Sequence, residues 1–214
     1  DDISYGNDCF IFGGCPAAAP FYFPFSVDRT SVGSGAFTAV STEVFGADSA
    51  AAADVFTTPG LGGPPCGATP NFLVIDGDGL LGGGPPPPGT VGMGLMEPLA
   101  PPPNPIQDDL DSLEMSDPIA VDFAPPWDGV LEAPVFFTLD PASAGFYGLS
   151  PADVLVAGPG YAPPGVFVIW APAVALGLDS FGPATDDIDA LGVSIPGPGA
   201  LFGAPGTGVI FSLG

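Results

Sequence analysis

The sequence repeats itself in order, and this repetition constrains the fold more than any other feature. The segment 25–31 (FSVDRTS) returns as 137–143 (FTLDPAS) and begins a third time at 211–213 (FSL). Three more pairs of segments match in the same order: 53–56 with 152–155, 72–75 with 167–170, and 108–113 with 186–191. Collinear matches of this kind indicate duplication of one structural unit.

The repeated unit is expected to consist of strands. Gly and Pro, which break helix interiors, account for 33 and 30 of the 214 residues. The apolar runs are rich in Val, Ile and Phe and end at Gly, Pro or Asp, as strands do. We therefore predict an all-β fold, in which a pseudo-two-fold repeat of about four strands per copy forms a sandwich or barrel. The predicted strands are 21–28, 54–56, 72–75 and 108–113 in the first copy, and 135–140, 153–157, 166–171 and 186–195 in the second.

The matches also divide the chain. We expect an N-terminal extension at 1–20, a first repeat at 21–118 and a Pro-rich joint at 119–134. A second repeat at 135–195 and a C-terminal tail at 196–214 complete the chain. The first copy is longer because of two insertions. One, at 32–52, is predicted to contain a short helix, and the other contains a stiff Pro-rich segment, GGGPPPPG, at 82–89.

The unfinished third copy predicts a ninth strand at 208–214, which needs a partner. It can close the sheet within its own chain against the strand at 21–28, or it can add to the sheet of a neighbouring chain. An unpaired strand edge is a template for such addition. The candidate assembly residues are Val209, Ile210, Phe211, Ser212 and Leu213.

The net charge of the chain limits which molecules it can bind. The chain has 24 acidic residues and a single base, Arg29, for a net charge of −23. Such a charge repels nucleic acid and favours divalent cations, although an acidic surface can also serve solubility alone. No apolar run reaches the length of a membrane helix.

The acidic residues gather in three places that suggest calcium. Alternating acids on a Gly-rich turn, or paired acids along a strand, can bind this cation. The alternative is a turn in which Asp caps backbone amides. The candidate ligands are Asp76, Asp78, Asp108, Asp109, Asp111, Asp186, Asp187 and Asp189. The first cluster also opens a G-x-G-x-x-G pattern at 77–82, which we do not interpret as a dinucleotide site because acids and prolines surround it.

No catalytic residue can be identified from the sequence. It contains no His and no Lys, so a Ser or Cys nucleophile lacks its usual base. A hydrolase that uses carboxylates alone stays an alternative. Cys9 and Cys15 can form a disulfide around a short loop, and Cys66 is left over. Trp127, in the Pro-rich joint, is a candidate sugar-binding aromatic.

The segments FSVDRTSVG, NFLVI, FFTLDPAS, SPADVLV and DDIDAL together resemble a loose group of secreted bacterial repeat proteins without assigned activity. The resemblance implies export and a β-rich unit, and an N-terminal Asp is consistent with a removed signal peptide. Scarce Lys and Arg leave few sites for trypsin-like proteases. We therefore expect a non-enzymatic extracellular or cell-surface protein that assembles with copies of itself into a fibre or surface layer. The alternative is a calcium-dependent module that binds carbohydrate or mineral.

Overall fold

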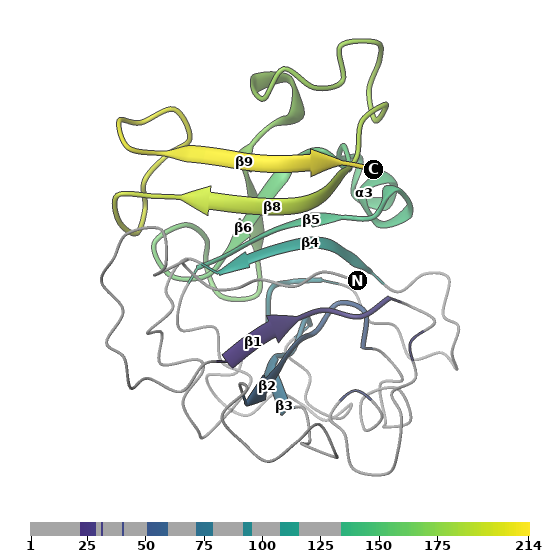
Figure 1. Ribbon diagram of the computed structural model, residues 1–214, viewed down its shortest axis with the longest axis vertical. Helices are drawn as coiled ribbons and strands as arrows, with labels where there is room; N and C mark the ends of the chain where they lie inside the picture. Colours follow the sequence, from purple (N-terminus) through teal and green to yellow (C-terminus); the bar gives the residue numbers. More distant parts are fainter. Residues whose placement is uncertain are drawn as a thin grey trace.

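Antiparallel strands make up most of the regular structure, which confirms the all-β class (Figure 1). The computed structural model describes residues 22–28, 31, 40, 51–59, 72–78, 92–95, 108–115 and 134–214. Several predictions lie outside these ranges: the Cys9–Cys15 loop, Cys66, Arg29, Trp127, the Pro-rich segment 82–89 and nearly all of the helix expected within 32–52.

The described strands form three sheets. The first sheet has the order β1 (Tyr22–Phe25), β2 (Val55–Pro59) and β3 (Phe72–Ile75). The middle sheet has the order β4 (Leu110–Met115), β5 (Val135–Leu139), β6 (Val154–Ala157) and β7 (Phe167–Ala171). The terminal sheet pairs β8 (Ile188–Ser194) with β9 (Gly208–Leu213). Each strand lies where the sequence predicts one, and Figure 1 shows the sheets following one another in chain order.

The middle sheet is buried on both faces. Alternate residues of β5 point to opposite sides, as the pleat of a strand requires. Val135, Phe137 and Leu139 belong to a core cluster shared with the first sheet. Phe136 belongs to a second cluster, which the inner face of the terminal sheet helps to cover. Every residue of β5 is consequently buried.

The strands β4 and β5 pair in the same register as the strands β8 and β9. Leu110 lies opposite Leu139 where β4 pairs with β5, and the register shifts at the next residue of β4. Ile188 lies opposite Leu213 where β8 pairs with β9, again with a shift at the next residue of β8. The two ladders then continue in step to their ends. A bulge places two residues opposite one, so two bulges in matching places are a specific likeness.

The remaining ladders also correspond, with one correction to the sequence alignment. Phe25 lies opposite Phe56, as Phe137 lies opposite Leu155. The sequence aligned 72–75 with 167–170, but Phe56 faces Leu73 while Leu155 faces Ile169. Residues 72–75 therefore correspond to 168–171, one residue later. The alignment was wrong here because it matched Phe72 with Phe167, and the ladder rather than side-chain identity sets the register.

A buried carboxylate supports this corrected register in both sheets. Asp54 Oδ1 accepts a hydrogen bond from the N–H of Gly77 at 2.9 Å. Asp153 Oδ1 accepts one from the N–H of Ala173 at 2.8 Å. Each donor lies two residues after the end of its strand, β3 or β7. The two Asp residues thus fasten the end of the third strand to the start of the second in the same way.

A short helix, α3 (Pro141–Tyr147), follows β5. From the sequence alone, an Asp followed three residues later by Ser, as in Asp28–Ser31 and Asp140–Ser143, predicts an Asp-initiated turn at both places. Asp140 caps the helix by accepting hydrogen bonds from the N–H groups of Ala142 and Ser143. Asp at the N-cap followed by Pro at the first helical position is a helix-start signal, which the turn prediction did not use. The matching Asp28 accepts a hydrogen bond from the Ser31 hydroxyl at 3.2 Å, so the turn prediction is confirmed there.

Candidate functional site

The C-terminal strand β9 pairs within its own chain. Its partner is β8, and not β1 as closure against the first copy would require. The inner-face residues Val209 and Phe211 pack against the second core cluster. Among the described residues, no strand pairs with the opposite edge of β9. The expected ninth strand therefore exists, and one of its edges has no partner strand in the part of the chain that the structure describes.

Two hydroxyl groups help to hold the terminal sheet on the middle sheet. Thr138 Oγ1 donates to the carbonyl of Ile188 at 3.2 Å. Ser112 Oγ lies 2.6 Å from Thr138 Oγ1, and because the single hydrogen of Thr138 goes to Ile188, Ser112 is the donor of this pair. Both side chains are fully buried. The strand β8 also packs against β4, and Figure 1 shows the terminal sheet lying above the middle sheet.

Ile210 occupies the position on β9 that Phe136 occupies on β5. Ile210 lies opposite Gly192 and Phe136 lies opposite Glu114, at the same step of the two ladders. Phe136 is fully buried and makes T-shaped contacts with Trp170 and Tyr161, whose ring centroids lie 5.0 and 5.6 Å away. Ile210 is 81% exposed. An apolar side chain that is covered in the middle sheet thus has an uncovered counterpart in the terminal sheet.

Along the edge of β9 that has no described partner, backbone N–H groups point outward, and none of them has an acceptor within the described ranges. The N–H of Gly214 donates to the carbonyl of Asp187, so it points toward β8. The N–H groups of successive residues point to opposite edges of a strand. Those of Ile210 and Ser212, two and four residues from Gly214, therefore also point toward β8. Those of Val209 and Phe211 point away from β8. On β5 the corresponding N–H groups face β6, which pairs with it there.

The other described strand at a corresponding position is protected. Pro24 on β1 lies opposite Thr57, at the step where Phe136 lies opposite Val156. By the same alternation its nitrogen faces away from β2, and a proline nitrogen has no hydrogen to donate. Proline on an edge strand discourages pairing with another chain. The strand β9 contains neither proline nor a charged residue.

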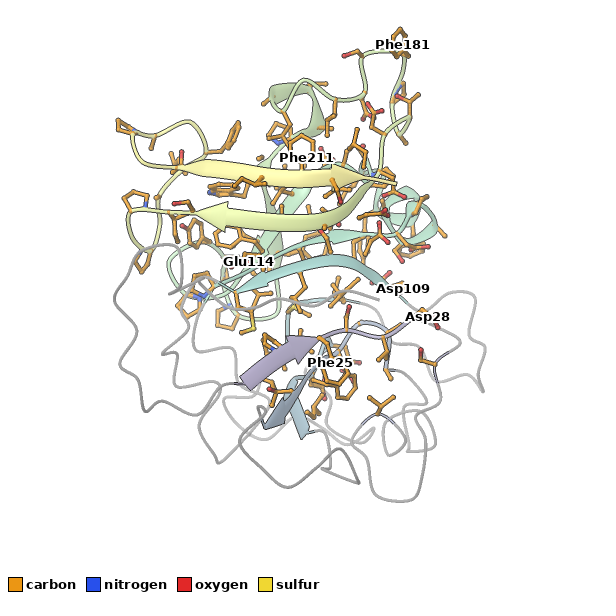
Figure 2. The ribbon with its side chains drawn as sticks, viewed as in Figure 1. Phe25, Asp28, Asp109, Glu114, Phe181 and Phe211 are labelled. Carbon is orange, nitrogen blue, oxygen red and sulfur yellow. The ribbon has the colours of Figure 1, made fainter. Side chains whose placement is uncertain are left out.

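The acids of the first paired segment are used structurally. Asp108 is buried and accepts a hydrogen bond from the Tyr147 hydroxyl. The N–H of Asp109 donates to Ser143 Oγ at 3.0 Å, and its carbonyl accepts from Asp140 at 3.1 Å. These bonds fasten helix α3 to the start of β4. Figure 2 shows Asp109 at that end of the strand.

The second paired segment closes a loop. Asp186 accepts a hydrogen bond from the N–H of Asp179, whose Oδ1 in turn accepts from Thr185 and Asp186. Burial acts to raise the pKa of Asp179, but hydrogen bonds from Ser150 and from backbone N–H groups outweigh it and lower the pKa. Asp179 adopts the left-handed conformation, with φ of 56°, which Asp tolerates better than most residues. At the far end of this loop Phe181 is 96% exposed (Figure 2).

The two acidic segments approach each other at Asp111 and Asp187. The carboxyl groups of Asp111, on β4, and Asp187, just before β8, lie next to each other. Burial, the contact with Asp187 and the charge of Asp189 raise the pKa of Asp111 to about 7. Burial and the charge of Asp189 also raise the pKa of Asp187. Two carboxylates in contact cannot both ionise easily, so the pair retains one proton to a higher pH than an isolated carboxyl group does.

The expected calcium ligands do not gather into one cluster. Asp76 is buried and Asp78 is half-buried at the end of β3, far along the chain from the paired segments, and Asp189 is exposed. Across the described ranges, no three Asp, Glu or Cys side chains lie close enough together to hold a metal ion. Asp111 Oδ2 and Asp187 Oδ1 are nevertheless buried and have no hydrogen-bond partner among the described residues.

The sequence reasoning missed Asp54 and Asp153. Both lie within the matched Ala-Asp-Val segments, but no role was predicted for either carboxylate. The sequence feature that could have revealed them is an acidic residue between apolar residues, because a buried carboxylate is tolerated only when it accepts hydrogen bonds or is paired with a positive charge. Both residues are buried and accept the backbone hydrogen bonds described above.

No protein-family model, curated protein or solved structure matches this chain. Within the part of the chain that the structure describes, no helix is long and apolar enough to cross a membrane.

Proposed function

We propose that this chain is a non-enzymatic structural protein that assembles with copies of itself outside the cell, as a subunit of a fibre or surface layer. Strand addition at the open edge of β9 would provide the contact. The resemblance to secreted repeat proteins and the scarcity of Lys and Arg support an extracellular setting. The matching ladders and the uncovered surface of the terminal sheet support assembly.

The proposal includes duplication of one four-stranded unit. In the middle sheet, the last strand of the first copy (β4) is followed by three strands of the second copy (β5, β6 and β7). In the terminal sheet, β8 and β9 repeat the first two positions with the same register. The place that β6 occupies beside β5 is open beside β9 among the described strands. An added strand would fill an interior position of the repeated sheet rather than extend a natural edge.

The edge of β9 that has no partner among the described strands is the observation that carries the proposal, and the outer face of the same sheet, which carries Ile210, is a second uncovered surface. Phe136, the counterpart of Ile210, is fully buried, whereas Ile210 is 81% exposed. Its neighbour Ser212 is exposed, while the corresponding Thr138 is buried. Covering an apolar side chain is favourable by about 25 cal/mol per Å² of apolar surface. Addition of a strand would also satisfy the N–H groups of Val209 and Phe211.

Charge favours contact at this end of the molecule. With a net charge of −23, two copies repel each other over most of their surfaces. The segment from Ala190 to Leu213 has no charged side chain. Copies can therefore approach through the terminal sheet at the lowest electrostatic cost, and salt should strengthen the association because it screens the remaining repulsion.

Sedimentation velocity across a wide range of concentrations tests the proposal. The unaltered chain should form larger species as concentration and salt increase. Val209→Pro removes an outward N–H without removing a donor to β8, so it should reduce association. Val209→Ala loses the side chain but keeps the N–H, and is the matched control. A chain that stays monomeric under all conditions would contradict the proposal.

A second candidate function is calcium-dependent binding of carbohydrate or mineral. It is favoured by the two buried oxygens of Asp111 and Asp187 that lack hydrogen-bond partners. A divalent cation could replace the shared proton and bridge the two carboxylates. Calorimetric titration with calcium should then release heat at neutral pH and none in Asp111→Asn. Equal heats in both proteins, or none in either, would count against this candidate.

A further inference from the structure

The open edge of β9 is self-complementary. Its outward N–H groups belong to alternate residues, so a second β9 running antiparallel can exchange hydrogen bonds with it symmetrically. A two-fold axis at Phe211 places this residue opposite its own copy. Val209 then faces Leu213 of the second copy, and Ile210 faces Ser212. A contact of this kind uses the same surface on both partners, as two-fold dimers do.

Side-chain chemistry agrees with this register. The pairs on the inner face are Phe211 with Phe211 of the second copy and Val209 with Leu213, which are all apolar. Leu213 is 49% exposed in the single chain and would be covered. On the outer face, Ile210 would lie beside the small Ser212. No charged side chain occurs on β9, so the pairing opposes no like charges.

The other described sheet edges fit a second copy less well. Pro24 deprives β1 of a donor on its free side, as shown above. The strand β7 also has one edge without a partner among the described strands. It is the last strand of the middle sheet, as β3 is the last strand of the first sheet, so an unpaired edge is the regular state at this position. The strand β9 instead corresponds to β5, which has a neighbour on both sides.

We propose that β9 pairs antiparallel with β9 of a second copy, with Phe211 opposite Phe211. This inference rests on the proposed function and specifies its partner and register. The joint places β8 and β9 of both copies in one continuous sheet, with the two molecules tail to tail. It brings the two outer faces that carry Ile210 onto the same surface, where a larger assembly can continue.

Cysteine cross-linking tests the register. In the proposed pairing, Ile210 and Ser212 of the second copy form a non-hydrogen-bonded pair with Cα atoms about 4.5 Å apart, within reach of a disulfide. Position 210 lies diagonally from position 210 of the second copy, beyond the roughly 7 Å limit. Both side chains are exposed, so Ile210→Cys and Ser212→Cys should fold normally.

The two variants are oxidised separately and as a mixture, and peptides that contain the new cysteines are identified by mass spectrometry. The mixture should give the 210–212 cross-link, and each variant alone should give no self-cross-link at its new position above the background of the native cysteines. Association in sedimentation without the mixed cross-link would overturn the register and leave the proposed function standing. A monomeric chain at every concentration would overturn both.

Discussion

Phe136 in the middle sheet and Ile210 in the terminal sheet hold the same ladder position but lie in opposite environments. The first is fully buried and the second is 81% exposed. The pairing with the preceding strand is the same, but β5 also has β6 beside it and a sheet on each face. The middle sheet has the first sheet on one face and the terminal sheet on the other. The comparison shows that coverage by a neighbouring sheet, rather than strand sequence alone, determines burial in this fold.

The largest expected effect follows directly from this comparison. Phe136→Ala should reduce the free energy of unfolding by about 3–5 kcal/mol, because it leaves a cavity between two sheets. Ile210→Ala should change it by no more than about 0.5 kcal/mol in the monomer, because the side chain is already in water. Denaturant unfolding at low protein concentration measures both. Similar losses for the two variants would mean that Ile210 is covered in the monomer.

A smaller effect is expected at the two buried carboxylates. Asp153→Ala removes acceptors for the N–H groups of Ala173 and Ser150, and should cost about 1–3 kcal/mol. Asp54→Ala should destabilise the chain by a similar or smaller amount, because it removes the matching bond to Gly77. The exposed Asp189→Ala is the control, with a change within about 0.5 kcal/mol. If only one of these two substitutions lowers the free energy of unfolding, Asp54 and Asp153 do not have equivalent roles in the first and middle sheets.

The smallest expected effect concerns pH. The pKa of Asp111 rises from an ordinary 3.8 to about 7 in the folded protein, so the folded chain binds more protons than the unfolded chain between these values. Stability should therefore decrease as pH rises from about 4 to about 7 and level off above. Asp111→Asn keeps a donor to Asp187 but cannot titrate in this range, so it should flatten that decrease.

Unfolding midpoints measured across this pH window provide the comparison. Asp189→Asn removes one charge that contributes to the raised pKa of Asp111, but it keeps burial, which is the largest cause, and the contact with Asp187, so it should retain most of the decrease. Because both carboxyl groups are only partly buried, solvent screens their interaction and the effect should be modest. A decrease that persists unchanged in Asp111→Asn would assign it to other carboxyl groups.

The positions of the strands were predictable because repeated apolar runs end at Gly, Pro and Asp. Internal comparison of the copies placed β9, although its residues alone form a weak signal. The alignment was wrong by one residue at β3 because Phe72 and Phe167 are identical while the ladder follows backbone bonds. Helix α3 was missed because Asp140 and Pro141 suit a turn and a helix start equally well in a short window.

The acidic segments show where reasoning from one sequence stops. The sequence predicts paired acids on two strands, but it cannot show that Asp111 lies against Asp187 while Asp108 and Asp186 fasten a tyrosine and a loop. Those contacts depend on how β8 lies beside β4, which is a property of the packed sheets. The strand β9 itself was predicted, but the choice of β8 as its partner was not.

Hydrogen–deuterium exchange at single amides of β9 tests the central claim most directly. Strand addition should slow exchange at Val209 and Phe211 as protein concentration rises, because these N–H groups point away from β8. Ile210 and Ser212 should be protected at every concentration, because theirs point toward it. Association with unchanged, rapid exchange at Val209 and Phe211 would contradict strand addition at this edge.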